Sequence, residues 1–107
     1  MRLAISTILV CSFLSAAHAQ EPTGNAAEGK RIATQLCADC HDVSGNEVSR
    51  DSPGGVPAFN VLARSRDHTP RMLRRYLRLP HGRMANVIVT RREAEDVISY
   101  IEALRRP

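Results

Sequence analysis

The most constraining feature of this 107-residue sequence is the pentapeptide CADCH at residues 37–41. In a helix, positions i, i+3 and i+4 lie on one face, so Cys37, Cys40 and His41 are expected to point in the same direction. Two thiols and an imidazole on one face suit a flat ligand that has two attachment points and a central metal. The C-x-x-C-H spacing therefore predicts covalent attachment of one haem c, with His41 as the proximal ligand of the iron.

Two other uses of a C-x-x-C pair agree less well with the rest of the chain. A thioredoxin-like redox pair usually lies beside a βαβ unit, and no strand pattern precedes Cys37. A zinc site needs a second pair of ligands, and His68 and His81 are too far apart in the sequence for the usual spacing. A disulfide between Cys37 and Cys40 would close a loop too short to stabilise a fold. Haem attachment remains the preferred interpretation.

The N-terminus has the pattern of a secretory signal peptide over residues 1–19. Arg2 precedes an apolar run from Leu3 to Leu14, and residues 17–19 (AHA) supply the small-x-small pattern that signal peptidase recognises. The run is short for a membrane span, so an N-terminal anchor is the weaker alternative. We expect a mature domain of residues 20–107 that is exported to a bacterial-type periplasm and keeps no membrane span.

Charge and composition argue against a nucleic-acid binder. The sequence has 15 Lys and Arg against 11 Asp and Glu, and since Arg2 belongs to the predicted signal peptide, the mature segment carries a formal charge of +3. Its only aromatic side chains are Phe59, Tyr76 and Tyr100, too few to stack on bases. A domain of this size usually needs a disulfide, a metal or a cofactor to complete its core.

Helical periodicity and capping residues predict an all-α domain of three to four helices. Thr69 and Pro70 provide an N-cap hydroxyl and a proline at the first helical position, and Thr90 with Glu93 forms a capping box. The expected helices cover residues 25–41, 57–65, 70–79 and 90–104, with loops at 42–56 and 80–89. The apolar face of the third comprises Met72, Leu73, Tyr76 and Leu77, and that of the fourth comprises Val97, Tyr100, Ile101 and Leu104.

With these motifs, the mature chain resembles a small class I cytochrome c over nearly its whole length. In that family the haem motif ends the N-terminal helix, a proline after the first loop offers its carbonyl to the haem histidine, and a methionine from a late loop binds the other side of the iron. The resemblance implies the class I cytochrome c fold around one covalently bound haem. It also implies that Pro57, in the segment GVPAF, orients His41.

The resemblance extends to the helix crossing, with two departures. The family places a glycine of the first helix against an aromatic residue of the last, and Gly29 and Tyr100 match those positions. Ala33 stands where the family often has an aromatic residue, so we expect the crossing to be packed differently or less fully. Ala85 stands where the family commonly has a proline after the ligand methionine, so we expect a less rigid loop and a weaker sulfur–iron bond.

Four side chains are candidates for the second axial ligand: Met72, Met84, His68 and His81. Met84 is preferred because it lies in a loop with proline and glycine just before the last helix, where the family has its ligand. Met72 has the helical spacing of a core residue. His68 is expected to be exposed, and His81 is the main rival as a loop residue.

Ligation by His41 and Met84 would leave no open coordination site, which suits one-electron transfer by a carrier that is not an enzyme. Two alternatives stay open: a haem c subunit of a multi-chain dehydrogenase, and a ligand-binding haem protein with a labile sixth site. Four arginines at helical spacing form a stripe opposite the apolar face of the 70–79 helix: Arg71, Arg74, Arg75 and Arg78. This stripe is either a solvated surface, a docking surface for an acidic redox partner, or a source of a cation that neutralises a haem propionate.

Overall fold

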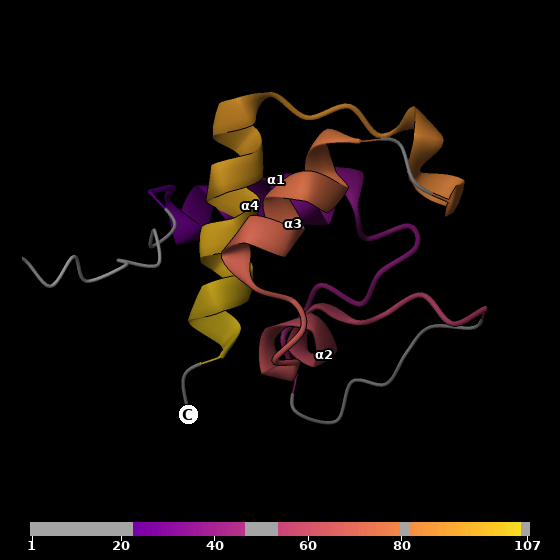
Figure 1. The fold of residues 1–107 in the computed structure, drawn as a ribbon, viewed down its shortest axis with the longest axis horizontal. Helices are drawn as coiled ribbons and strands as arrows, with labels where there is room; N and C mark the ends of the chain where they lie inside the picture. Colours follow the sequence, from indigo (N-terminus) through magenta and orange to yellow (C-terminus); the bar gives the residue numbers. More distant parts are fainter. Residues whose placement is uncertain (1–22, 47–53, 80–81, 106–107) are drawn as a thin grey trace, which may run out of the picture.

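The computed structural model describes residues 23–46, 54–79 and 82–105, and the described chain is helical (Figure 1). In chain order the elements are α1 (Ala26–Leu36), α2 (Phe59–Arg64), α3 (Pro70–Arg78), the short 3₁₀-helix η1 (Gly82–Asn86) and α4 (Arg91–Leu104). These ranges contain no strand, and the predicted all-α class is confirmed. The predicted signal peptide, residues 1–19, lies outside the described residues. No helix in the described ranges is long and apolar enough to cross a membrane.

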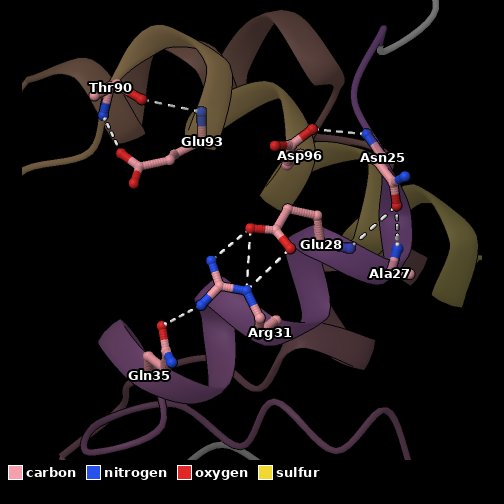
Figure 2. Close-up of polar contacts among 8 residues, drawn as sticks. All are labelled: Asn25, Ala27, Glu28, Arg31, Gln35, Thr90, Glu93 and Asp96. Atoms are coloured by element: carbon pink, nitrogen blue, oxygen red, sulfur yellow. Dashed lines mark hydrogen bonds and ion pairs between the residues drawn. The ribbon is translucent and has the colours of Figure 1, made fainter.

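The helices α3 and α4 begin at the predicted capping residues. The hydroxyl of Thr69 accepts a hydrogen bond from the Met72 amide at 3.3 Å. At the start of α4, the Thr90 hydroxyl accepts from the Glu93 amide at 3.2 Å, and the Glu93 carboxylate accepts from the Thr90 amide at 2.7 Å (Figure 2). Each side chain satisfies a backbone donor that has no partner within the helix, which explains why both helices start there.

The first helix is shorter than the sequence predicts. Asn25 caps its start by accepting from the amides of Ala27 and Glu28, but α1 ends at Leu36 rather than at His41. Cys37 is the C-cap and still lies in the right-handed helical region, with φ at −115° and ψ at −21°, but residues 37–40 form a turn and do not continue the helix. The CADCH motif therefore forms a separate turn directly after α1.

The helix α4 is the centre of the fold because α1, α2 and α3 each pack against it. Figure 1 shows α1 crossing α4 steeply, with α3 lying across α4 on another side. The predicted apolar face of α4 is confirmed: Val97, Tyr100 and Ile101 are buried, and Leu104 packs at the edge of the core. The buried core cluster consists of Ile32, Ala33, Cys37, Phe59, Leu62, Ala63, Leu73, Val97, Ile98, Tyr100 and Ile101.

The crossing of α1 and α4 is a backbone-to-backbone contact. A Cβ added at Gly29 would overlap the carbonyl group of Asp96, so the nearest atoms to this glycine belong to the helix backbone one turn before Tyr100. Asp96 is itself buried, and its carboxylate accepts from the Asn25 amide at 2.7 Å (Figure 2). Ala33 is completely buried, and its small side chain is compatible with this close approach.

The stripe of α3 that packs against the core is narrower than the apolar face predicted from the sequence. Leu73 is buried and Leu77 packs against the core, as expected. Met72 and Tyr76, which belong to the predicted apolar face, are exposed at 38% and 42%, so α4 covers only part of that face. The reason is that α3 packs against α4 alone among the described helices, and one neighbour covers only one stripe of a helix surface.

Candidate functional site

The two thiols and the imidazole of the CADCH turn are close in sequence but differ in how far they are buried. The amides of Cys40 and His41 both donate to the Cys37 carbonyl oxygen, at 3.1 and 2.9 Å, which closes the turn. Both cysteines are free thiols, with Cys37 buried and Cys40 exposed. Burial raises the pKa of the Cys37 thiol, because the apolar surroundings disfavour a thiolate. The turn therefore offers two unpaired sulfur atoms next to an imidazole.

The imidazole of His41 is held by a backbone carbonyl. Its Nδ1 lies 2.6 Å from the carbonyl oxygen of Pro57, sixteen residues along the chain. Since a carbonyl can only accept, Nδ1 carries a proton, and Nε2 is the ring nitrogen that this bond does not engage. The His41 ring is half-buried, which leaves Nε2 as the nitrogen that can bind a metal. This is the contact that the resemblance implies for Pro57.

Phe59 places the Pro57 carbonyl next to His41. Its amide donates to the Asp42 carbonyl oxygen at 2.9 Å, which joins the start of α2 to the residue after His41. Its ring is buried and meets the His41 ring edge-on, with the centroids 5.5 Å apart at an interplanar angle of 64°. Phe59 was not among the site residues predicted from the sequence. The scarcity of aromatic residues was the only signal that could have drawn attention to it.

Tyr100 of α4 completes this side of the site. Its ring lies 6.2 Å from that of Phe59, centroid to centroid, and its hydroxyl donates to the Val43 carbonyl oxygen at 2.7 Å. Burial raises the pKa of the Tyr100 phenol, and the negative charge of Asp42 adds to the rise. The phenol therefore stays protonated and keeps donating its hydrogen bond.

The candidate axial ligands lie in different settings. Met84 is half-buried in η1, and in the described chain η1 packs against none of the four α-helices. Met72 is exposed on α3. His68 is half-buried rather than exposed as expected, and its backbone carbonyl accepts from the Arg105 guanidinium at 3.3 Å. His81 lies outside the described residues.

The predicted arginine stripe divides into one paired and three exposed side chains. Arg74 forms a two-pronged ion pair with Glu95 of α4, with N–O distances of 2.6 and 3.0 Å. This hydrogen-bonded pair lowers the pKa of the Glu95 carboxyl. Arg71, Arg75 and Arg78 are exposed. A shallow hollow lies among the four arginines and Leu79.

The donor atoms in this region fit a c-type haem. Two free thiols can become thioethers, the Nε2 atom of His41 can bind iron, and Met84 supplies a soft thioether sulfur. The described chain also exposes several large apolar side chains, and such surface suits contact with an apolar cofactor: Leu36, Met72, Tyr76, Leu79 and Ile88.

Comparison with known proteins agrees with this interpretation of the site. The family model for cytochrome c matches residues 26–105. The chain is also 31% identical over 98 residues to cytochrome c-552 of Bradyrhizobium diazoefficiens, which covers 90% of this chain and 92% of that protein. No solved structure gave a significant match to the chain. The sequence match thus includes the CADCH turn, Pro57, Met84 and the core of α4.

Proposed function

Because the chain belongs to the cytochrome c family, we propose that it is a periplasmic one-electron carrier with His41 and Met84 as axial ligands. Membership implies haem-based electron transfer and one covalently attached haem c, for which Cys37 and Cys40 are positioned. When bound, the haem iron supplies the change between ferric and ferrous states. The protein's own residues fix its orientation and set its potential.

The contact between His41 and Pro57 is the observation that carries the proposal. A hydrogen bond of 2.6 Å from Nδ1 to a backbone carbonyl fixes both the tautomer and the ring plane. A histidine held in this way next to a C-x-x-C pair has Nε2 ready as a permanent metal ligand. The same bond increases the electron density of the His41 ring, which favours ferric iron and therefore lowers the reduction potential.

Met84 is proposed as the second axial ligand. It is half-buried in η1, close in the sequence to α4, and its neutral thioether favours ferrous iron and raises the potential relative to a second histidine. With haem bound, His41 and Met84 would together leave no position for an external ligand, and electron transfer would need little rearrangement.

The assignment of Met84 is tested with the variant Met84→Ala and the control Met72→Ala. The wild-type ferric protein is expected to show the weak near-infrared band of methionine–iron ligation, and the reduced protein is expected not to bind CO at neutral pH. Met84→Ala should lose the band and bind CO, whereas Met72→Ala should behave as wild type. A Met84→Ala protein that kept the band would refute the assignment.

One observation favours a second candidate function, a haem protein that binds small ligands. The helix η1 packs against none of the α-helices in the described chain, and Ala85 follows Met84 where the family commonly has proline. A sulfur–iron bond in such a segment is easier to break. CO binding by the reduced wild-type protein at neutral pH would support this second function over the first.

The protein is also proposed to be exported and to act as a free carrier. Residues 1–19 are proposed as a signal peptide, so the protein isolated from the periplasm should begin at Gln20. A free carrier should elute in size-exclusion chromatography of a native periplasmic extract at the size of one small domain. Stable elution with a larger chain would instead indicate a subunit of a dehydrogenase.

The exposed arginines of α3 are proposed as a docking surface for an acidic redox partner. Arg71, Arg75 and Arg78 present positive charge on one helix, beside the shallow hollow that Leu79 helps to line. Charge of this kind increases the rate of encounter with a negatively charged partner. Arg74 contributes less to this surface because Glu95 neutralises it.

A further inference from the structure

We propose that Tyr100 is a positioning residue for His41, acting through Val43 and Phe59. The inference rests on the proposed role of His41 as an axial ligand. It goes further by assigning the orientation of the His41 ring, and hence part of the reduction potential, to a hydroxyl group on the last helix.

Three consecutive residues after the cysteine pair are each held by a separate hydrogen bond. His41 Nδ1 donates to the Pro57 carbonyl oxygen at 2.6 Å, the Asp42 carbonyl oxygen accepts from the Phe59 amide at 2.9 Å, and the Val43 carbonyl oxygen accepts from the Tyr100 hydroxyl at 2.7 Å. The first two bonds come from the segment that opens α2. The third ties the chain segment after His41 to α4.

The aromatic side chains of these segments also contact one another. Phe59 contacts both other rings, with centroid distances of 5.5 Å to His41 and 6.2 Å to Tyr100. Phe59 and Tyr100 are only 3% and 6% exposed, so neither ring has free space in which to turn. Contact with the Phe59 ring therefore limits rotation of the imidazole, and Tyr100 in turn packs against Phe59.

A phenylalanine at position 100 would fill the same space but lose one bond. The Tyr100 hydroxyl donates a hydrogen bond from α4 to the Val43 carbonyl oxygen, next to Asp42, whose own carbonyl oxygen is bound to the start of α2. Without it, the Val43 carbonyl is free to turn to solvent, and the short segment from His41 to Val43 gains freedom. The Pro57 carbonyl and the His41 ring then separate more often, which weakens their hydrogen bond.

Weakening that hydrogen bond has two measurable consequences. The Nδ1 proton of His41 exchanges with solvent more quickly, because each separation exposes it. The imidazole also becomes less basic, which favours ferrous iron and raises the reduction potential. Simple loss of stability elsewhere in the fold would produce neither effect.

The test compares holoprotein carrying Tyr100→Phe with a control of similar stability loss, Thr90→Ala. The control removes the N-cap of α4, ten residues before Tyr100 in the same helix. In Tyr100→Phe, proton NMR of the reduced protein should show the His41 Nδ1 proton exchanging roughly fivefold faster than in wild type. The ferric-to-ferrous ratio at a fixed ambient potential should fall about threefold, a positive shift of ~28 mV at 59 mV per tenfold. Thr90→Ala should change neither quantity.

A second variant keeps the test decisive if Tyr100→Phe matures poorly. Phe59→Leu removes the ring edge beside His41 but keeps the amide that binds Asp42. The pattern of haem-methyl NMR shifts in its ferric form should differ from wild type, because that pattern follows the plane of the imidazole. If Tyr100→Phe and Phe59→Leu both retain wild-type exchange, potential and methyl shifts, Tyr100 only fills the core and the inference is wrong. Failure of His41 ligation itself would appear separately, as an absent low-spin spectrum in the wild-type protein.

Discussion

At the scale of single residues, Gly29 determines how closely α1 can approach α4. Any side chain there would overlap the Asp96 carbonyl, which belongs to the backbone of a helix and cannot move aside cheaply. The approach in turn allows the Asn25 amide to reach the buried Asp96 carboxylate. The missing side chain at Gly29 therefore permits the close crossing. The missing side chain at Gly24, where a Cβ would overlap the Glu95 carbonyl, permits the contact made by the adjoining Asn25.

Gly29→Ala is expected to lower the free energy of unfolding of the holoprotein by about 2–3 kcal/mol. The overlap with α4 costs more than the gain in helix propensity from alanine. Thermal denaturation followed at the haem absorbance would measure the loss. The neighbouring change Lys30→Ala, at an exposed position, should stay within about 0.5 kcal/mol of wild type. Equal stability of the two variants would contradict the described crossing.

At the scale of helices, the parts that depend on neighbouring residues in the sequence were predictable. Thr69-Pro70 and Thr90-Glu93 act within one helical turn, and both helices begin where these caps predict. Which side of α3 is covered was not predictable, because it depends on where α4 lies. Met72 was expected in the core for its spacing alone, and Arg74 was grouped with the exposed arginines for the same reason.

The ion pair between Arg74 and Glu95 makes the packing of α3 on α4 sensitive to acid. The pair lowers the pKa of Glu95 below its ordinary value of 4.5. Its stabilisation is therefore fully present above pH 4.5 and is lost as the pH falls through the lower folded-state value. Arg74→Met should lose roughly 1–2 kcal/mol of unfolding free energy at neutral pH and show a smaller further loss below pH 4.5.

Denaturant unfolding at several pH values would measure this effect. Arg71→Met, an exposed change on the same helix, is the matched control and should keep both the stability and the acid sensitivity of wild type. If Arg74→Met were as acid-sensitive as the control, the carboxylate would not be stabilised by this guanidinium.

Like the helices, the candidate site was predictable from the sequence only where its residues are close neighbours along the chain. The CADCH spacing predicted the attachment turn because all its members lie within five residues. The approach of Pro57 to His41 came from family resemblance and not from any local pattern. The support of His41 by Phe59 and Tyr100 joins three separate segments, and no spacing rule relates them.

At the scale of the whole molecule, α3 presents three exposed positive charges on one helix, those of Arg71, Arg75 and Arg78. The triple variant of Arg71, Arg75 and Arg78 to glutamine should slow electron transfer with a small acidic redox protein by about tenfold at low ionic strength. Its rate should also depend less on salt than the wild-type rate, because the steering charge has been removed. Stopped-flow mixing over a range of salt concentrations would provide both quantities.

A control with the same loss of charge separates local docking from net charge. Lys30, Arg91 and Arg92 are exposed on α1 and α4, and changing all three to glutamine removes three positive charges elsewhere. This variant should retain most of the wild-type rate. If both triple variants slow the reaction equally, net charge and not the α3 surface governs the encounter.

All of the proposed chemistry depends on covalent attachment of one haem at the CADCH turn. Mass spectrometry of the peptide containing Cys37 and Cys40, from protein isolated after export, measures this attachment. We expect a single peptide that carries the added mass of one haem and has no thiol left to alkylate. A peptide of unmodified mass with two alkylatable thiols would contradict it.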